Sequence, residues 1–305
     1  MNNQNQSVKI WAGLITLYLV WGSTYLGIRF VVASVPAIMA SGFRNFFAGA
    51  ILLTFALLSG KFKKPTPEML KTTVLSGLMM LTVGNSLFTI SAKWVPSSYS
   101  ALFSASGPVM LIILLWLMNK EKPQPKVMLG AILGMVGVGI LMSLKTMAIA
   151  GFEDYYLLGI TFLFIAVLCW NIGVVVVSKS DLAQYHASQI AGTQMLVGGT
   201  ISLIISYFMK EFDNFHVQNV SHKALWSFAY ILTFGSVIAF LVFNWLSKVT
   251  TPTLVATYTY VNPLVAMILG GLFAGEHLHP LMMLSGAIII TAVILITSVE
   301  RKSQR

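Results

Sequence analysis

The chain has 305 residues, of which 57% are hydrophobic and only 9% are charged, and its mean hydropathy is +0.82. Soluble domains carry about a quarter charged residues, so the composition excludes a water-soluble globular protein and places most side chains in a lipid bilayer. The net charge of +10 does not indicate a nucleic-acid partner, because the basic residues lie in short breaks between apolar runs. The single cysteine, Cys169, excludes an internal disulfide.

Apolar runs of about 20 residues, the length of a membrane-spanning helix, follow one another along the chain. The alternation of about ten residues that is typical of a membrane β-barrel does not occur. We therefore predict an all-α membrane protein. Its ten transmembrane helices are expected at 10–30, 37–58, 70–92, 97–118, 126–144, 156–178, 187–208, 224–246, 252–273 and 280–298.

A pattern of a basic residue, a proline and a glutamate occurs twice at equal spacing. It consists of Lys93, Pro108 and Glu121 and recurs 155 residues later as Lys248, Pro263 and Glu276. Such a recurrence indicates an internal duplication, with one five-helix repeat in residues 1–150 and the other in residues 151–305. Because five is odd, the second repeat enters the membrane upside down, which predicts two inverted five-helix repeats around a shared site.

The distribution of Lys and Arg predicts the orientation. With both termini in the cytoplasm, thirteen of the nineteen basic residues fall on the cytoplasmic side, five on the other, and Arg44 within a span. Cytoplasmic loops carry an excess of Lys and Arg. We therefore expect a multi-pass membrane protein with both termini cytoplasmic.

Pro108 and Pro263 are expected near mid-membrane, as hinges of the fourth and ninth spans. A proline has no N–H to give to the carbonyl four residues earlier, so the carbonyls of Ser104 and Thr259 lose a partner. Such groups must be satisfied by neighbours or line a wet cavity. A kink that is capped locally is the alternative interpretation.

Aromatic and amide side chains gather at the same expected depth, and they suit a cavity for an amphipathic solute. Packing and interfacial anchoring are the alternative roles for each of them. The candidate solute-binding residues are Trp21, Tyr25, Asn85, Phe103, Ser104, Trp170, Asn171, Asn244, Thr259, Tyr260 and Asn262.

Few charged groups are expected inside the membrane. Arg44 is the one charge well inside a predicted span, and it either meets a substrate carboxylate or is a fixed structural ion. The structural role is favoured because Gln194, its repeat mate 150 residues later, is uncharged. Glu121 and Glu276 stand at helix ends and are expected to reach the membrane interface. The sequence shows no catalytic nucleophile with its base, metal-ligand set or dinucleotide motif, so we expect no metal or cofactor.

The motifs together resemble the EamA-type branch of the drug/metabolite transporter superfamily. The segments that carry the resemblance are Trp21-Gly22-Ser23-Thr24-Tyr25, Arg44, Pro108 to Glu121, and Asn262-Pro263 to Glu276. The resemblance covers almost the whole chain. It implies a ten-helix, inverted-repeat exporter of small metabolites, often amino acids or hydrophobic compounds, in a prokaryotic plasma (inner) membrane.

The sequence thus predicts a secondary transporter of an amino acid or an amphipathic drug-like solute that works by alternating access, and the resemblance implies that it exports this solute. Its expected partners are a small-molecule solute and the lipid bilayer, with no nucleic acid. The alternatives are an intramembrane lipid-processing enzyme, for which the sequence shows no clustered acid and base, and a non-transporting membrane scaffold, which gives no reason for mirrored prolines.

Overall fold

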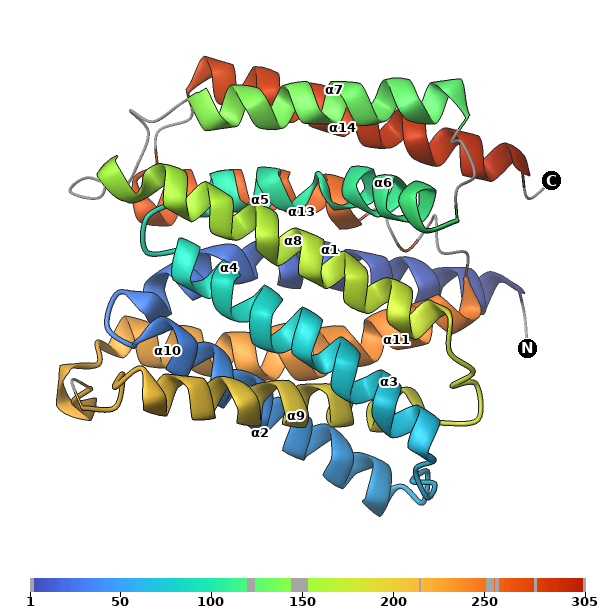
Figure 1. The fold of residues 1–305 in the computed structure, drawn as a ribbon, viewed down its shortest axis with the longest axis vertical. Coiled ribbons are helices and arrows are strands. Elements are labelled where there is room, and N and C mark those ends of the chain that lie inside the picture. Colours follow the sequence, from blue (N-terminus) through green and yellow to red (C-terminus); the bar gives the residue numbers. More distant parts are fainter. Residues whose placement is uncertain are drawn as a thin grey trace.

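The computed structural model describes residues 3–119, 124–143, 153–213, 215–250, 255, 258–276 and 279–303. Every element in these ranges is helical. Figure 1 shows two helix pairs at opposite ends of the long axis of the molecule, α7 with α14 and α2 with α9, and the remaining helices between them. Helix α1 begins and α14 ends on the same side of the bundle.

The helices follow one another with short connections. The long ones are α1 (Asn3–Val32), α2 (Ala37–Leu58), α8 (Tyr156–Ser178), α9 (Ala187–Phe208) and α14 (Pro280–Ser303). The shorter ones are α3 (Pro67–Gly77), α4 (Asn85–Ser91), α5 (Ser97–Ser104), α6 (Gly107–Asn119), α7 (Pro125–Ser143), α10 (His222–Tyr230), α11 (Ala239–Val249) and α13 (Tyr258–Ala274). Short 3₁₀ turns occupy Glu153–Tyr155 and Val217–Asn219.

Several of these helices have the length and hydropathy to cross a membrane. Within the described ranges, six stretches meet both criteria: Gln6–Val32, Ala37–Leu58, Pro67–Ser91, Tyr156–Ser178, Ala187–Phe208 and His222–Phe243. Three shorter apolar stretches are Pro125–Gly137, Val261–Ala274 and Pro280–Ala292. The all-α membrane class predicted from the composition is confirmed.

Helices α2 and α9 lie in very close contact at two glycines. A Cβ atom added to Gly49 would lie 2.4 Å from the backbone nitrogen of Leu196, and one added to Gly199 would lie 2.3 Å from that of Phe46. Side chains of any size would therefore force the two backbones apart. The residue number of the contact partner falls along α9 as the residue number rises along α2, so the two helices are antiparallel.

A second pair of glycines extends this symmetric contact. A Cβ on Gly42 would meet the side chain of Leu203 at 2.9 Å, and a Cβ on Gly192 would meet that of Leu53 at 2.9 Å. Adding 150 to the α2 member of each contact, and subtracting 150 from the α9 member, turns one contact into the other. The two helices thus use equivalent faces, as subunits do at a two-fold interface.

The third and eighth predicted spans are not regular α-helices. Each contains a π-helical segment, η1 (Leu78–Gly84) and η5 (Ile231–Ile238), at corresponding places in the two halves. The segments end with equivalent bonds, in which the N–H of Asn85 donates to the carbonyl of Met80 and that of Ala239 to the carbonyl of Phe234. π-bulges inside α-helices are frequent at functional sites.

The two prolines differ in their effect on the chain. The expected kink of a continuous helix at Pro108 is wrong, because α5 ends at Ser104 and α6 begins only at Gly107. Pro108 is the second residue of α6, where its missing N–H breaks no intrahelical bond. Pro263, in contrast, lies inside the continuous helix α13.

The side chain of Glu276 does not point in the direction expected from the sequence. Its side chain is 3% exposed and forms an ion pair with Arg29 at the end of α1. Its oxygens also accept hydrogen bonds from Ser97 and Ser98, at the start of α5. The side chain therefore points into the protein and does not extend outward, which is the direction expected for a glutamate at a helix end. Glu121 lies outside the described residues.

Candidate functional site

A cavity of about 530 Å³ lies between the helices, within the usual range of about 300–1,000 Å³ for small-molecule sites. Its lining comes from α1, α2, η1, α4, α5, α6, α8, α9, η5, α11 and α13, and therefore from both halves of the chain. None of the described lining residues belongs to α7 or α14.

One side of the cavity is aromatic and centres on Trp21. The ring of Trp21 lies 4.7 Å from that of Tyr258, 5.3 Å from Phe243 and 5.8 Å from Phe240, measured between centroids. Its indole N–H donates to the carbonyl of Gly235 at 3.0 Å. Because Gly235 belongs to η5, the bond joins the indole to the π-helical segment and orients it among the neighbouring rings.

Most of the predicted solute-binding residues line this cavity. Those that do are Trp21, Tyr25, Asn85, Ser104, Trp170, Asn171, Thr259 and Asn262, together with Pro108 and Arg44. The structure also brings three of them together, because the hydroxyl of Tyr25 lies close to the side chains of Ser104 and Asn262.

Four other predicted site residues are not among the described residues that line the cavity. Phe103 does not line the cavity: its side chain is fully buried in a core cluster with Tyr99 and Tyr156. Pro263 is buried in α13 and is likewise not part of the lining. Asn244 and Tyr260 belong to α11 and α13, and their side chains lie outside the described part of the structure.

Two of the cavity amides also support the fold. Asn171 donates to the carbonyls of Gly107 at 3.1 Å and Val167 at 2.9 Å, so it joins α8 to the start of α6. Asn262, with its amide oriented to satisfy both ends, donates to the carbonyls of Tyr18 and Tyr258 at 3.3 and 3.0 Å. Substitution of either amide is therefore expected to affect folding as well as any ligand.

The cavity contains further residues that the sequence did not single out as binding residues. Many are aliphatic or glycine, and the polar or aromatic ones are Thr24, Asn45, Phe88, Ser236, Phe240, Phe243 and Tyr258. The duplication contained a usable signal, since Phe88 and Phe243 are 155 residues apart and both line the cavity. Trp21 and Trp170, 149 residues apart, form a second such pair.

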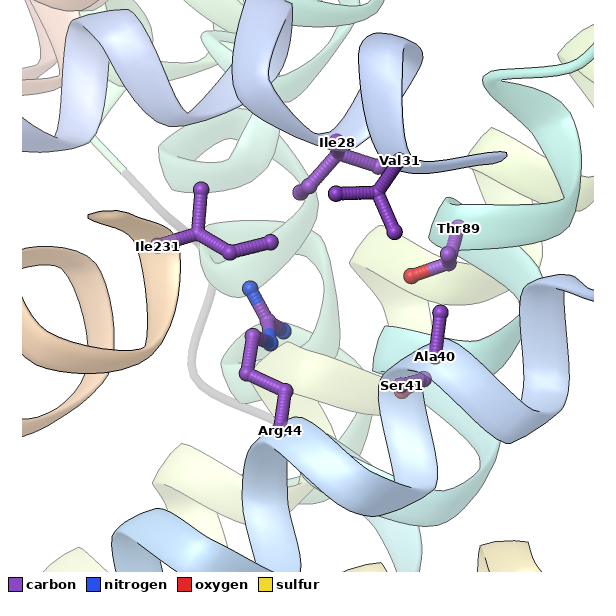
Figure 2. A pocket seen from close by; sticks show the side chains of 7 residues that line it. All are labelled: Ile28, Val31, Ala40, Ser41, Arg44, Thr89 and Ile231. Atoms are coloured by element: carbon purple, nitrogen blue, oxygen red, sulfur yellow. The ribbon is translucent and has the colours of Figure 1, made fainter. Parts of the chain in front are cut away.

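Arg44 extends from α2 between the large cavity and a small crevice of about 10 Å³, which has room for about one water molecule. Figure 2 shows its guanidinium pointing away from α2 toward Ile28, Val31 and Ile231. The residue is 8% exposed. Within the described lining of both spaces, Arg44 is the one side chain with a formal charge.

An all-helical bundle with membrane-length helices and a ligand-sized cavity defines a polytopic membrane protein with a central cavity. The chain belongs to the EamA-like transporter family, whose model matches residues 9–143 and 157–298. The resemblance drawn from the sequence motifs is confirmed, and the protein is a membrane transporter of the drug/metabolite transporter type.

Curated relatives extend along almost the whole chain. The uncharacterized inner membrane transporter YedA of Escherichia coli strain K12 is 32% identical over 297 residues, which cover 96% of this chain and 92% of YedA. The uncharacterized transporter YvbV of Bacillus subtilis strain 168 is 24% identical over 293 residues, and Protein PecM of Dickeya dadantii is 25% identical over 290 residues. For these two, the matches cover 96% and 94% of this chain, and 92% and 91% of the relatives.

The fold is shared with a crystal structure that covers 98% of this chain, which in turn covers 99% of that protein. The two have a TM-score of 0.64 and 17% sequence identity. At this level of identity the likeness concerns the fold alone.

Proposed function

We propose that the protein is a secondary transporter that exports a small amphipathic solute, such as an amino acid or a drug-like compound, by alternating access. The solute would occupy the cavity between the two halves. The single observation that carries the proposal is the cavity of about 530 Å³ lined by aromatic and amide side chains of both halves. Binding at the interface of two repeats is the usual arrangement in secondary transporters.

We further propose ten transmembrane helices in two inverted repeats, residues 1–150 and 151–305. Three observations support this arrangement. Helices α2 and α9, which are 150 residues apart, make equivalent contacts in antiparallel orientation. The π-helical segments occur at matching places, and α1 and α8 run in opposite directions in Figure 1.

The location follows from the family and from the charges. We propose a multi-pass protein of a prokaryotic inner membrane with both termini in the cytoplasm. The name of the relative YedA as an inner membrane transporter supports the membrane, and the excess of Lys and Arg on the side of the termini supports the orientation. The start of α1 and the end of α14 at the same side of the bundle agree with an even number of spans.

The hinges would lie beside Pro108, where the chain is interrupted between two helices, and beside Pro263, inside the continuous helix α13. The break between α5 and α6 carries Ser104 and Pro108 at the cavity wall. Residues Thr259 and Asn262 line the same cavity just before Pro263 in α13. Bending at these two places would open the cavity to one side and close it to the other.

Solute exchange in proteoliposomes tests the proposal. The full chain would be reconstituted and preloaded with unlabelled solute, and the uptake of labelled L-phenylalanine, L-leucine and tetraphenylphosphonium would be followed. We expect accelerated exchange of at least one of them. Exchange of none of the three above the rate of protein-free liposomes would contradict a transporter of amino acids or amphipathic solutes and would favour a scaffold.

Substitution of two tryptophans, one in the cavity and one outside it, tests whether the solute passes through the cavity. Trp170 lines the cavity, whereas Trp226 in α10 is 74% exposed on the outer surface. We expect Trp170→Ala to slow exchange at least about tenfold, and Trp226→Ala to leave it unchanged. Equal rates in both variants would place the solute path elsewhere.

A further inference from the structure

Arg44 is a buried cation without a described acceptor. The residue is 8% exposed, yet no hydrogen bond or ion pair joins its guanidinium to any residue that the structure describes. The nearby polar groups are engaged with each other. Thr89 donates to the carbonyl of Asn85 at 2.7 Å, and the amide of Asn85 donates to Asn45 at 3.4 Å.

In the second repeat, the residue that corresponds to Arg44 has a hydrogen-bond acceptor. This residue is Gln194, 150 positions after Arg44, and its side-chain amide donates to the hydroxyl of Ser76 at 2.7 Å. The residue 155 positions after Ser76 is Ile231, at the same offset that relates Phe88 to Phe243. Figure 2 shows Ile231 facing the guanidinium of Arg44, so the matching place offers a hydrocarbon side chain instead of an acceptor.

A buried guanidinium without a counter-charge is costly, and its compensation must come from a group that can reach it. The described lining of the cavity contains no Asp or Glu. The cavity itself does reach Arg44, together with Thr24, Asn45 and Asn85. Arg is the side chain best shaped to hold a carboxylate through two parallel hydrogen bonds.

We propose that Arg44 is the anion-binding residue of the cavity and that the transported solute carries a carboxylate. This inference rests on the proposed function and narrows its substrate class to organic anions and zwitterions with an apolar part. The opposite end of the solute would contact the rings of Trp21, Phe240 and Phe243.

The spacing along α1 sets the scale of this solute. Ile28 lines both spaces beside Arg44, and Trp21 stands at the centre of the aromatic surface. The two residues are seven positions apart, roughly 10 Å along the helix at 1.5 Å per residue. A carboxylate joined to a phenyl or branched aliphatic group by a short chain matches this distance.

Direct binding to the purified full chain tests the assignment independently of transport. Matched pairs of a carboxylate and the corresponding amide, which lacks the negative charge, are compared by isothermal titration calorimetry in a neutral detergent, where no lipid headgroup competes. The pairs are benzoate with benzamide, 3-phenylpropionate with 3-phenylpropanamide, and L-phenylalanine with L-phenylalaninamide. We expect at least one carboxylate to bind about 10- to 100-fold more tightly than its amide, the usual range for a charged hydrogen-bonded pair.

Three substitutions test whether that preference depends on Arg44. Arg44→Gln installs the residue found at the mate position and should abolish the preference for the carboxylate. Ile231→Glu keeps Arg44 but places a carboxylate opposite it, and it should abolish the preference as well. Arg44→Lys keeps the charge without the planar fork and should retain only part of it. Gln194→Ala, in the other half, serves as the control and should leave the preference intact.

The outcomes separate this inference from the transporter proposal. Amides that bind as well as their carboxylates, absence of binding by every carboxylate, or an unchanged preference in Arg44→Gln would each overturn the role of Arg44. Carboxylate binding that depends on Arg44, without exchange in proteoliposomes, would keep the binding site and contradict the transporter. Exchange that is fast for tetraphenylphosphonium alone would keep the transporter and contradict the anion site.

Discussion

Glu276 caps the helix that begins at Ser97, although the two residues are 179 positions apart. One carboxylate oxygen accepts from the backbone N–H of Ser97 at 2.8 Å and from its hydroxyl at 2.7 Å, and the other accepts from the N–H of Ser98 at 3.0 Å. The first turn of a helix leaves backbone N–H groups unpaired and favours a negative charge. With Arg29 as counter-ion, this carboxylate joins the end of α13 to α1 and α5.

Substitution of Glu276 by Gln should destabilise the protein by roughly 2 kcal/mol, because a neutral amide loses the ion pair and turns one acceptor into a donor that faces Ser98. The measurement is thermal unfolding of the purified full chain in detergent. Glu68 is an exposed glutamate in the first turn of α3, and Glu68→Gln should change stability by less than about 0.5 kcal/mol. Equal effects of the two substitutions would deny Glu276 its capping role.

The pH dependence of stability provides an independent test of the same carboxylate. Burial raises the pKa of Glu276, but the hydrogen bonds from Ser98 and Ser97 and the charge of Arg29 outweigh burial and bring the pKa below its ordinary value of 4.5. A carboxyl whose pKa is lowered on folding contributes its full stability above the unfolded pKa and loses it as the pH falls through the folded pKa.

The stability difference between the natural protein and Glu276→Gln should therefore be constant from about pH 8 to about pH 5. It should shrink on acidification below pH 4.5, the ordinary pKa of the carboxyl. Thermal unfolding of both proteins across this range measures the difference. A decrease that begins near neutral pH would mean that the carboxyl takes up its proton far more easily than the cap allows.

The close contact of α2 and α9 predicts a strong response to a single methyl group. A Cβ on Gly49 would lie 2.4 Å from the backbone of Leu196, so Gly49→Ala should cost about 1–3 kcal/mol despite the better helix propensity of alanine. Gly139 in α7 has no atom within 4 Å of an added Cβ. Gly139→Ala is the matched control and should be neutral or stabilising by up to about 1 kcal/mol. Similar thermal stabilities of the two variants would contradict the contact.

Hydropathy located the regular helices well. The predicted limits 37–58, 156–178 and 187–208 are the limits of α2, α8 and α9, because a helix in lipid must satisfy its own backbone over the full apolar run. The repeat offsets also located residue pairs that line the cavity, such as Ser104 with Thr259.

Local departures of the backbone from regular α-helix could not be predicted from the sequence. The π-helical segments before Asn85 and Ala239 shift hydrogen bonds from the fourth to the fifth residue back, and no residue type requires this shift. The pairing of Glu276 with Arg29 escaped for another reason. The two residues are distant in the chain, and a glutamate at a helix end usually reaches water, so only the packing of α1 beside α13 brings them together.

Removal of the charge should affect the stability of the protein differently at Arg29 and at Arg44. Arg29 neutralises Glu276, so Arg29→Gln leaves a buried carboxylate without its counter-ion and should lower stability by about 1–3 kcal/mol. Arg44 has no described acceptor and is 8% exposed, so Arg44→Gln removes a costly charge and should leave stability unchanged or raise it by up to about 2 kcal/mol.

Thermal unfolding of both variants in detergent, without added carboxylate, decides between a structural and a ligand-binding Arg44. A structural ion is needed whether or not a ligand is present, and its removal lowers stability. A binding residue instead lowers stability when no ligand is present. Addition of a carboxylate probe should therefore raise the unfolding temperature of the natural protein, but not that of Arg44→Gln. If Arg44→Gln is destabilised to the same extent as Arg29→Gln, Arg44 is a structural ion. This is the role that the uncharged Gln194 at the equivalent position of the second repeat favoured in the sequence analysis.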